Sequence, residues 1–549
     1  MKDFKVYWDN ENNVPVIIDE QMDDLRIKSE GLEYLTTDLR PVFLREKHLI
    51  KHLFQFEDDI YYSSVWSTKQ GKYIIDGKVL KKSVISTAKG IEDIDTFREN
   101  VLSFEQTKMM EENEKKIINK FIELNKNHIF YLLESKDIDE EGHTIGAYPF
   151  VNEVIKKYSK RMPMVSFSGG KDSTVVSHIV RKATNNQSIL HIFGDTTLEL
   201  PETYQYVEEF KGDNPMTPFF EEKNEENNFF EMCKEIGPPS RVVAWCCSIF
   251  KTGPMGTTLS NFEEDFLNFY GVRRKESLKR SKYPKILKST KIDKQLSIAP
   301  IIDWLDIDVW LYMLTEQIKF NDSYRYGFAR VGCWVCPHRG AWSDFVTEIF
   351  NFDLSTKWKQ FLYTFADNIG KTDYKKYIDD EKWKIRRGAD GLKNTNKLNG
   401  SKECINEKNT YTFDFSREIK IDFISELFKP FGKIQYRNIN RSSTEILILN
   451  NKKPLFKVNF IPKKNNLKIT LMDLKDRYLL NKIKKQLNKY NFCTSCQACN
   501  SICPTGAITV SNGQYKIDED KCVHCLNCVN RFNDGCIVAF TLRTKKKEN

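Results

Sequence analysis

The first part of the sequence lacks two features, long apolar runs and cysteine. No segment approaches the ~18–20 uninterrupted apolar residues that a membrane helix needs. The start, MKDFKVYWDN, lacks the apolar core of a secretory signal. We therefore expect a cytoplasmic protein with no membrane partner. No cysteine precedes Cys233, which excludes a cysteine-based metal site from the N-terminal region.

Positive charge exceeds negative charge by a modest amount. The chain has 85 Lys and Arg against 76 Asp and Glu, a formal net charge of +9. Residues 451–490 are the most uneven stretch, with many Lys and few acidic residues. A solvated helix face explains such a stretch, and docking of RNA or of an acidic protein is the alternative. Nucleic acid therefore stays open as a partner.

The chain of 549 residues is long enough for about three or four domains. Residues 1–110 contain short β-prone runs, and Asp76-Gly77 in YIIDGKVL predicts a hairpin turn, so we expect a β-rich N-terminal domain. Apolar residues then recur at helical spacing from Glu111 to about Leu133 and from Val151 to Tyr158. This spacing predicts a helical connector over 111–160.

Strand and helix patterns alternate in the next segment, 161–385. MVSFS (164–168) and SILHIFG (188–194) are typical of buried strands, and STVVSHIVRKA (173–183) is typical of an amphipathic helix. Such alternation predicts an α/β fold with a doubly wound parallel sheet, which binds ligands at the carboxyl ends of its strands.

The remaining chain divides into three parts. Residues 386–404 are rich in Gly, Asn and Lys and are predicted to be a linker. Residues 405–490 predict a small basic α/β domain, with strands at TEILILN and LKITLMD. Residues 491–549 hold eight of the fourteen cysteines, and we expect a separate cysteine-rich domain there.

A glycine loop joins the first buried strand to its helix. Gly169 and Gly170 let backbone amides approach an anion closely, and the helix N-terminus adds partial positive charge. Lys171 and the serine hydroxyls add hydrogen-bond donors. The spacing differs from that of a Walker loop. The sequence therefore predicts a phosphate site at Ser168-Gly169-Gly170-Lys171-Asp172-Ser173.

The strand–SGGKDS–helix arrangement resembles the PP-loop superfamily, whose members bind ATP at its pyrophosphate end or bind adenylyl sulfates. Three further motifs resemble its 3'-phosphoadenylyl sulfate (PAPS) reductase branch: FGDTTLELPETYQYV at 193–207, GVRRKESLKR at 271–280 and IAPIIDWLDIDVWLYM at 298–313. The resemblance covers residues 160–340.

This resemblance implies roles for individual residues. The six loop residues would bind phosphate, and Asp172 could also engage Mg²⁺. Asp195 and Thr196 would face the nucleotide, and Arg273 and Arg280 would neutralise phosphate or sulfate. The catalytic candidates are Lys171, Asp172, Arg273 and Cys404.

A first set of cysteines lies within this region: Cys246, Cys247, Cys333 and Cys336. Adjacent cysteines have Cα atoms only ~3.8 Å apart, which is too close for a normal disulfide. The spacing resembles the signature by which iron–sulfur adenylyl sulfate (APS) reductases hold a [4Fe–4S] cluster, and His338 and Arg339 would add donors nearby. A structural zinc site and a redox dithiol are the alternatives.

The terminal block repeats a spacing typical of bacterial ferredoxins, C-x₂-C-x₂-C-x₃-C-P, with a second copy that departs from it before Cys536. In the ferredoxin-like fold that this block resembles, the fourth cysteine of each run binds the other cluster. The resemblance implies one [4Fe–4S] cluster on Cys493, Cys496, Cys499 and Cys536, and another on Cys522, Cys525, Cys528 and Cys503.

These resemblances imply an iron–sulfur oxidoreductase that reduces APS or PAPS to sulfite, with three clusters and a low-potential electron donor as partner. The intact SGGKDS loop supports an alternative, an ATP pyrophosphatase that activates a substrate for sulfur insertion, as in tRNA thiolation or DNA phosphorothioation. An electron-transfer or nucleotide-sensing module is a third hypothesis. The oligomeric state is not indicated.

Two weaker resemblances complete the sequence evidence. Thiol-dependent reductases of this family use a Glu-Cys-Gly-x-His tail, and Cys404 in SKECINE has only the preceding glutamate, so a linker cysteine is the alternative. The N-terminal region, with YWDNENNVPVI, loosely resembles the PUA-like RNA-binding segment of ferredoxin-bearing archaeal-type members. Cys233 is predicted to be a core residue.

Overall fold

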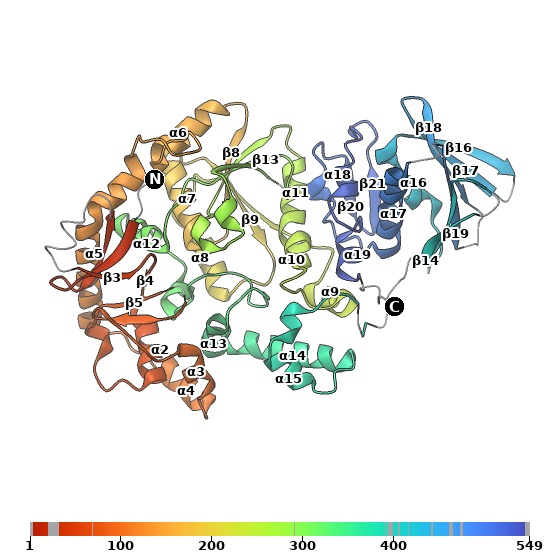
Figure 1. Ribbon diagram of the computed structural model, residues 1–549. Coiled ribbons are helices and arrows are strands. Elements are labelled where there is room, and N and C mark those ends of the chain that lie inside the picture. The colour runs from red at the N-terminus through yellow and green to blue at the C-terminus, as the bar shows by residue number, and fades with distance from the viewer. Residues whose placement is uncertain are drawn as a thin grey trace.

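Figure 1 shows the computed structural model of the chain. It describes residues 4–19, 32–68, 70–289, 291–389, 391–392, 399–404, 407–415, 417–440, 443–460, 465–472 and 476–543. The ribbon leads from the N-terminal strands (red) through a central sheet to a C-terminal unit (blue). Within the described residues, no helix combines the length and apolar content needed to cross a membrane.

Six described strands form the central sheet, in the order β10-β9-β8-β11-β13-β12. Neighbouring strands are parallel except for β12, which pairs antiparallel with β13 at one edge. This confirms the predicted α/β sheet and the strands near 164–168 and 188–194. The strands are β8 Met162–Phe167, β9 Leu190–Asp195, β10 Phe219–Lys223, β11 Phe266–Tyr270, β12 Ile286–Lys288 and β13 Gln295–Ile298.

Apolar side chains project from both faces of β8, and helices cover both sides of the sheet. Val165 shares a core with Val175 of α7, and Met164 packs on the other side with Met255 of α11. The carboxyl ends of β8, β9 and β11 therefore meet at one edge. The helices of this unit are α6 Ala147–Lys157, α7 Lys171–Thr184, α8 Pro201–Asp213, α9 Phe229–Ile236, α10 Trp245–Cys247, α11 Gly253–Ser260 and α12 Asp306–Thr315.

The N-terminal region holds two small sheets, β2-β1-β3 and β4-β5-β6-β7. The hairpin at Asp76-Gly77 is confirmed, because both residues have positive φ (46° and 79°) between β6 and β7. The strands are β1 Phe4–Asp9, β2 Val14–Asp19, β3 Glu33–Thr36, β4 Arg40–Pro41, β5 Val65–Ser67, β6 Tyr73–Ile75 and β7 Lys78–Val79.

Helices also occupy much of this region, for which the sequence predicted only a β-rich domain. Side-chain caps help to begin two of the helices, because Ser83 accepts from the Ser86 amide and Asp93 from the Thr96 amide. Apolar face packing then fixes them in the core shared with α13. These helices are α2 Leu44–Phe54, α3 Val84–Lys89 and α4 Ile94–Leu102.

The long helix α5, Lys108–Glu134, and α6 confirm the helices predicted from 111 to 133 and from 151 to 158. After the central sheet, three further helices pack beneath it in Figure 1: α13 Ala341–Phe350, α14 Phe352–Asn368 and α15 Tyr374–Asp379. Trp358 of α14 and Trp334 lie in the same apolar core as Cys233, which is fully buried as predicted.

A second six-stranded sheet, β14-β15-β19-β18-β17-β16, follows in antiparallel pairing. The strands predicted at 444–450 and 467–473 are confirmed as β17 and β19. The linker prediction is wrong over 399–403, because β14 pairs there with β15 and its backbone gains partners whatever its side chains. The bounds are β14 Asn399–Glu403, β15 Thr410–Asp414, β16 Lys433–Asn440, β17 Ser443–Asn450, β18 Lys453–Phe460 and β19 Asn466–Leu471.

The basic stretch continues into α17, Arg477–Phe492, which packs against α16, Ile421–Phe428, and leads into the cysteine-rich end. That end is built from short elements around one hairpin. They are η8 Asn500–Ile502, β20 Ile508–Ser511, β21 Gln514–Ile517, α18 Asn527–Asn530 and α19 Ile537–Thr541. In Figure 1 the cysteine-rich end lies between the central sheet and the second sheet.

Candidate functional site

The SGGKDS loop lies between the end of β8 and the start of α7, at the carboxyl edge of the central sheet. Gly169 has φ +66°, and a Cβ there would lie 2.9 Å from Cγ2 of Thr203, so both conformation and space require glycine. The Ser173 hydroxyl closes the loop: it accepts from the Ser168 amide at 3.1 Å and donates to the Gly170 carbonyl at 2.8 Å.

The N-terminus of α7 begins at Gly170 without a side-chain cap. Its partial positive charge is therefore directed into the loop. The Lys171 amide donates to the buried Tyr324 hydroxyl at 2.9 Å. Gly271, just after β11, lets the chain pass against this turn, because a Cβ there would lie 2.5 Å from the carbonyl carbon of Asp172.

Lys171, Asp172, Arg273 and Asp306 form one buried ion network. Lys171 Nζ lies 3.1 Å from Asp172 and 3.0 Å from Asp306. Arg273 reaches the same two carboxylates, at 2.6 Å through Nε and 2.5 Å through Nη2. Two cations thus balance two anions, and the network has no net charge to offer a ligand.

The electrostatics of the network hold it in its charged form. Burial alone would raise the pKa of Asp172, but Arg273 and Lys171 outweigh it and hold that pKa well below its usual range. Asp38 accepts the Asp306 amide at 2.7 Å. Its own pKa is raised to about 7, first by burial and then by the charge of Asp306.

The end of β9 connects the nucleotide motifs to the first cysteine set. Thr196 Oγ1 donates to Glu199 at 2.9 Å and lies 3.2 Å from the Cys333 sulfur. Asp195 accepts from the Thr197 amide at 2.7 Å and from the Tyr204 hydroxyl at 2.8 Å. Both carboxyl-end residues are buried and already engaged with protein partners.

The four cysteines of the first set come together in space. Cys246 and Cys247 lie in α10. The charges of Cys247, Cys333 and Cys336 contribute to a raised pKa of the Cys246 thiol, so all four cysteines are near one another. The hydrogen bond between the adjacent thiols raises the pKa of Cys246 and lowers that of Cys247. Burial opposes the second effect, and nearby cations support it.

Those cations form a group that we call the cation cluster: Lys251, Arg280, Lys291 and Arg330. The charges of Lys291, Lys251 and Arg330 help to lower the pKa of Cys247. The charge of Arg280 helps to lower the pKa of Lys291. Burial lowers the pKa of Arg280, and the charge of Asp172 opposes this effect. The cluster therefore extends from the SGGKDS loop to the first cysteine set.

Most of the cation cluster lacks acidic partners. Arg280 pairs with Glu276, whereas Lys251, Lys291 and Arg330 form no ion pair with a carboxylate in the described part of the chain. Burial raises the pKa of the Glu199 carboxyl, and the charge of Lys251 opposes this effect. An anion that reaches this place from the loop would meet uncompensated positive charge.

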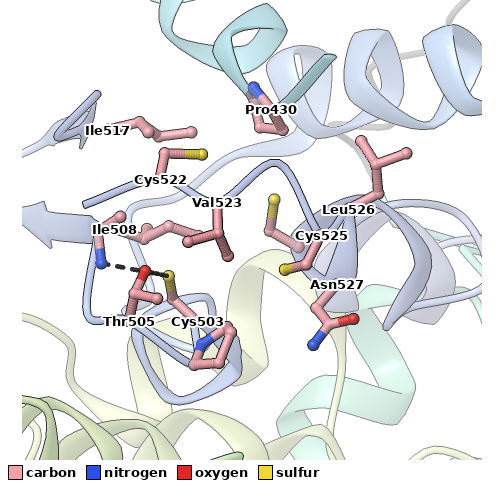
Figure 2. A pocket seen from close by; sticks show the side chains of 13 residues that line it. Pro430, Cys503, Thr505, Ile508, Ile517, Cys522, Val523, Cys525, Leu526 and Asn527 are labelled. Atoms are coloured by element: carbon pink, nitrogen blue, oxygen red, sulfur yellow. Dashed lines mark hydrogen bonds between the residues drawn. The ribbon is translucent and has the colours of Figure 1, made fainter. Parts of the chain in front are cut away.

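The eight terminal cysteines divide into two sets, each around its own cavity. Figure 2 shows the side chains around one of them, which we call the distal cavity, with the labelled cysteine sulfurs directed inward. We call the other one the proximal cavity. Cys503, Cys522, Cys525 and Cys528 line the distal cavity, and Cys493, Cys496, Cys499 and Cys536 line the proximal one. The crossed grouping implied by the resemblance is the grouping in space.

The two cysteine runs turn in the same way. Ser495 and Gln497 flank Cys496 with φ of 55° and 61°, and His524 and Leu526 flank Cys525 with φ of 52° and 60°. Each left-handed residue that is not glycine costs of the order of 1–2 kcal/mol. Repeating that cost at matched positions in both runs indicates that the loops are shaped to direct their thiols inward.

Buried polar atoms beside the proximal cavity bear on whether a cofactor fits. Tyr515 Oη and Thr494 Oγ1 are buried without a hydrogen-bond partner, and both residues line this cavity. In the distal cavity, the Ala507 amide donates to the Cys503 sulfur at 3.2 Å. Four soft thiolates, with polar groups nearby that can donate to sulfur, suit an iron–sulfur cluster. No three described His, Cys, Asp or Glu side chains are already placed as an assembled metal site.

The proximal set lies against the first cysteine set. Asn224 donates to the Ile249 carbonyl at 3.1 Å and to the Cys496 carbonyl at 3.4 Å. Cys496 and Cys536 belong to the same apolar core as Cys246. The distal set packs instead with the second sheet, and Cys525 is exposed.

A glycine contact holds the cysteine-rich end on the central domain. A Cβ at Gly256 of α11 would overlap the backbone of Ser501 in η8, and Asn500 donates to Thr257 at 3.0 Å beside it. We expect Gly256→Ala to separate these elements, at a cost of about 1–3 kcal/mol typical of overpacking. Limited proteolysis should then divide the two units faster. Gly212→Ala is the control, because a Cβ there meets nothing within 4 Å; equal proteolysis of both variants would contradict the contact.

The structure leaves one predicted catalytic residue apart. Cys404 follows the edge strand β14, where its amide donates to the Thr410 carbonyl at 2.8 Å. In Figure 1 this strand lies beyond the cysteine-rich end, far from α7 and α10. Arg339, which was predicted to be a donor near the first cysteine set, already pairs with Asp344 and donates to the Trp334 carbonyl and to Thr347.

Sequence reasoning missed Asp38, Asp306, Lys251 and Lys291. Asp306 lies inside the quoted 298–313 motif, so a signal existed. The motif's other acids have structural partners: Asp308 bonds His128 at 2.8 Å and caps α12, and Asp303 pairs with Arg274. Lys251 lies four residues after Cys247, a helical spacing that could have marked it, whereas no sequence pattern marks Asp38 or Lys291.

Comparisons with known proteins agree with this picture for the central domain. Residues 162–339 match the family model for the phosphoadenosine phosphosulfate reductase domain. An uncharacterized protein of Methanocaldococcus jannaschii is 34% identical over 252 residues, which are 45% of this chain and 51% of that protein. The adenosine 5'-phosphosulfate reductase of Oceanobacillus iheyensis is 28% identical over 203 residues, 37% of this chain and 81% of that protein.

A solved structure, the phosphoadenylyl-sulfate reductase of Candida auris, is 15% identical with a TM-score of 0.27, covering 37% of this chain and 98% of that one. This chain spans about half the length of the first curated relatives it matches. The family match includes the SGGKDS loop and the first cysteine set and ends before the terminal cysteines. Residues 162–339 are therefore a domain similar to those of the phosphoadenosine phosphosulfate reductase family.

Proposed function

We propose that this protein is an iron–sulfur oxidoreductase that reduces an adenylyl sulfate, APS or PAPS, to sulfite. The nucleotide's phosphate would lie against the backbone at 168–173, and its sulfonyl group would lie beside Cys247. Two electrons from a low-potential donor would enter the sulfonyl group, the P–O–S bridge would break at sulfur, and AMP or its 3'-phosphate would leave with sulfite.

The cation cluster is the observation that carries this proposal. The network at Lys171 and Arg273 is internally neutral, so the uncompensated charge lies between the loop and the first cysteine set. A nucleotide whose acidic end extends beyond its α-phosphate toward Cys247 would gain most from this charge. An adenylyl sulfate has such a group, and its charge increases as it leaves as sulfite.

The neutral network has a separate role in the proposal. Arg273 and Asp306 fix the position of Asp172, and Asp172 fixes Lys171 at the first turn of α7. With its cations already paired, the network positions the loop rather than supplying net charge. Loop amides and the Ser168 hydroxyl would then make the direct contacts to phosphate.

The cysteine sets fit the cofactors that the proposal requires. Cys246, Cys247, Cys333 and Cys336 would hold one [4Fe–4S] cluster, and the proximal and distal sets would hold one each. Clusters bound there would pass electrons one at a time. Asn224 would hold the proximal set against the first set, and the exposed Cys525 side would face an external donor.

The alternative is an ATP pyrophosphatase that releases AMP and pyrophosphate, and the intact SGGKDS loop favours it. In that reaction Asp172 would engage Mg²⁺. Here both of its oxygens already face cations, at 2.6 Å from Arg273 and 3.1 Å from Lys171, so a metal would have to displace one of them. This pairing makes the reductase the better supported hypothesis.

Charge removal tests the position of the sulfonyl group. We expect Lys251→Gln and Lys291→Gln each to weaken APS binding about tenfold, because each removes one uncompensated cation, while AMP binding changes less than twofold. Equilibrium binding by calorimetry on the iron-loaded full chain measures both ligands. Lys288→Gln, on the exposed end of β12, is the matched control.

The same measurement separates the two functions. A loss confined to APS supports the reductase. An equal loss for AMP and APS, or a loss seen with ATP and absent with APS, would place the cluster around another part of the nucleotide and contradict the proposal.

A further inference from the structure

Lys489 of α17 is a charged side chain in an unusual place. It is 1% exposed, and within the described residues it forms no ion pair with a carboxylate. Its Nζ donates to the Cys528 carbonyl at 2.7 Å and lies 5.5 Å from the Tyr515 ring centre. A buried ammonium is costly unless negative charge lies nearby.

The terminal cysteines would supply this negative charge as cluster-bound thiolates. Lys489 lines the proximal cavity. Burial lowers the pKa of its ammonium group, and the charges that outweigh this effect belong to Cys499, Cys528, Cys536 and Cys493, in order of decreasing strength. Three of these four belong to the proximal set. The contact with Cys528, through its carbonyl, reaches the distal set. Lys489 therefore lies between the two sets and closer in effect to the proximal one.

We infer that Lys489 is a positioning residue for electron flow, whose buried charge makes the proximal cluster easier to reduce than the distal one. The inference rests on the proposed occupancy of both cavities by [4Fe–4S] clusters. One-electron reduction adds one negative charge to a cluster, so a fixed cation beside it stabilises the reduced form.

The expected difference in reduction potential would draw electrons from the distal set toward the central domain. Electrons would enter at the distal set, where Cys525 is exposed, and would favour the proximal set, which Asn224 holds against the first cysteine set. A cation equidistant from both cavities would raise both potentials equally and favour neither. The placement of Lys489 thus predicts where an electron rests when only one is present.

The test compares Lys489→Met with the wild type in the iron-loaded full chain. Met retains the apolar stem and removes the charge. In a dithionite titration followed by electron paramagnetic resonance, we expect the reduced-to-oxidised ratio of the proximal cluster at a fixed potential to fall about tenfold, equivalent to about 59 mV for one electron. The distal signal should shift less. Cys496→Ser and Cys525→Ser, which remove a proximal and a distal ligand, assign these two signals among those of the three clusters.

Two further variants make the result specific. Lys489→Arg keeps the charge and should restore most of the ratio. Lys482→Met removes a lysine on the same helix whose Nζ lies 4.3 Å from the Tyr478 ring centre and which lines neither cavity, and it should leave both signals unchanged. Full iron content with no shift in Lys489→Met, or an equal shift in both signals, would overturn the inference and leave the proposed function intact. Wild-type protein without iron at the terminal sets would overturn both.

Discussion

Arg273→Met is expected to lower the free energy of unfolding of the central domain by about 3–5 kcal/mol, the cost of leaving a buried charge without its partner. Arg273 contacts both Asp172 and Asp306, and its side chain is 5% exposed. Without it, two buried carboxylates share Lys171 alone. Anaerobic thermal unfolding should show a midpoint lower by roughly 10 °C, and nucleotide binding should be lost with the loop's geometry.

A matched pair of variants tests the cause. Lys319→Met breaks an exposed ion pair with Asp213 at 2.8 Å and should cost less than about 1 kcal/mol. Adding Asp172→Asn to Arg273→Met restores neutrality and should recover part of the lost stability. If Arg273→Met is as mild as Lys319→Met, the buried network does not hold the loop.

Cys536→Ser is expected to remove about four of about twelve iron atoms from the chain, because serine is a poor ligand for a cluster that four thiolates hold. Cys536 is the cysteine whose spacing departs from the ferredoxin pattern, yet it lines the proximal cavity with Cys493, Cys496 and Cys499. Iron and acid-labile sulfide analysis of anaerobically purified protein measures the loss.

The distal set provides a parallel test, and a buried cysteine outside both sets provides the control. Cys503→Ser should remove a similar amount of iron, from the other cavity. Cys233→Ser should remove none, because Cys233 is buried in an apolar core and lines neither cavity. Full iron content in Cys536→Ser would contradict the crossed assignment of ligands.

Local patterns predicted the parts of this fold that depend on short stretches of chain. The strand at 164–168, the glycine loop and the helix after it lie within twenty residues, and each follows from apolar spacing and from glycine's conformational freedom. The hairpin at Asp76-Gly77 followed from turn chemistry in the same way. The crossed cysteine grouping was implied by the resemblance of the repeated spacing to that of bacterial ferredoxins.

Long-range partners could not be predicted in this way. Asp38 reaches the Asp306 amide across 268 positions, and Lys291, in the loop after β12, acts on the charge of Cys247 from a distant part of the sequence. β14 was read as linker because its composition is polar, whereas an edge strand needs only a neighbour with free backbone groups. Lys489 looked like one more lysine of a basic helix.

The most direct measurement is a single-turnover reaction of full-length, iron-loaded, dithionite-reduced protein with APS, PAPS or ATP in the absence of oxygen. Our account predicts that one sulfated nucleotide yields sulfite together with AMP or its 3'-phosphate in equal amounts, and that ATP remains intact. AMP and pyrophosphate formed from ATP, with no sulfite from either sulfated nucleotide, would contradict it.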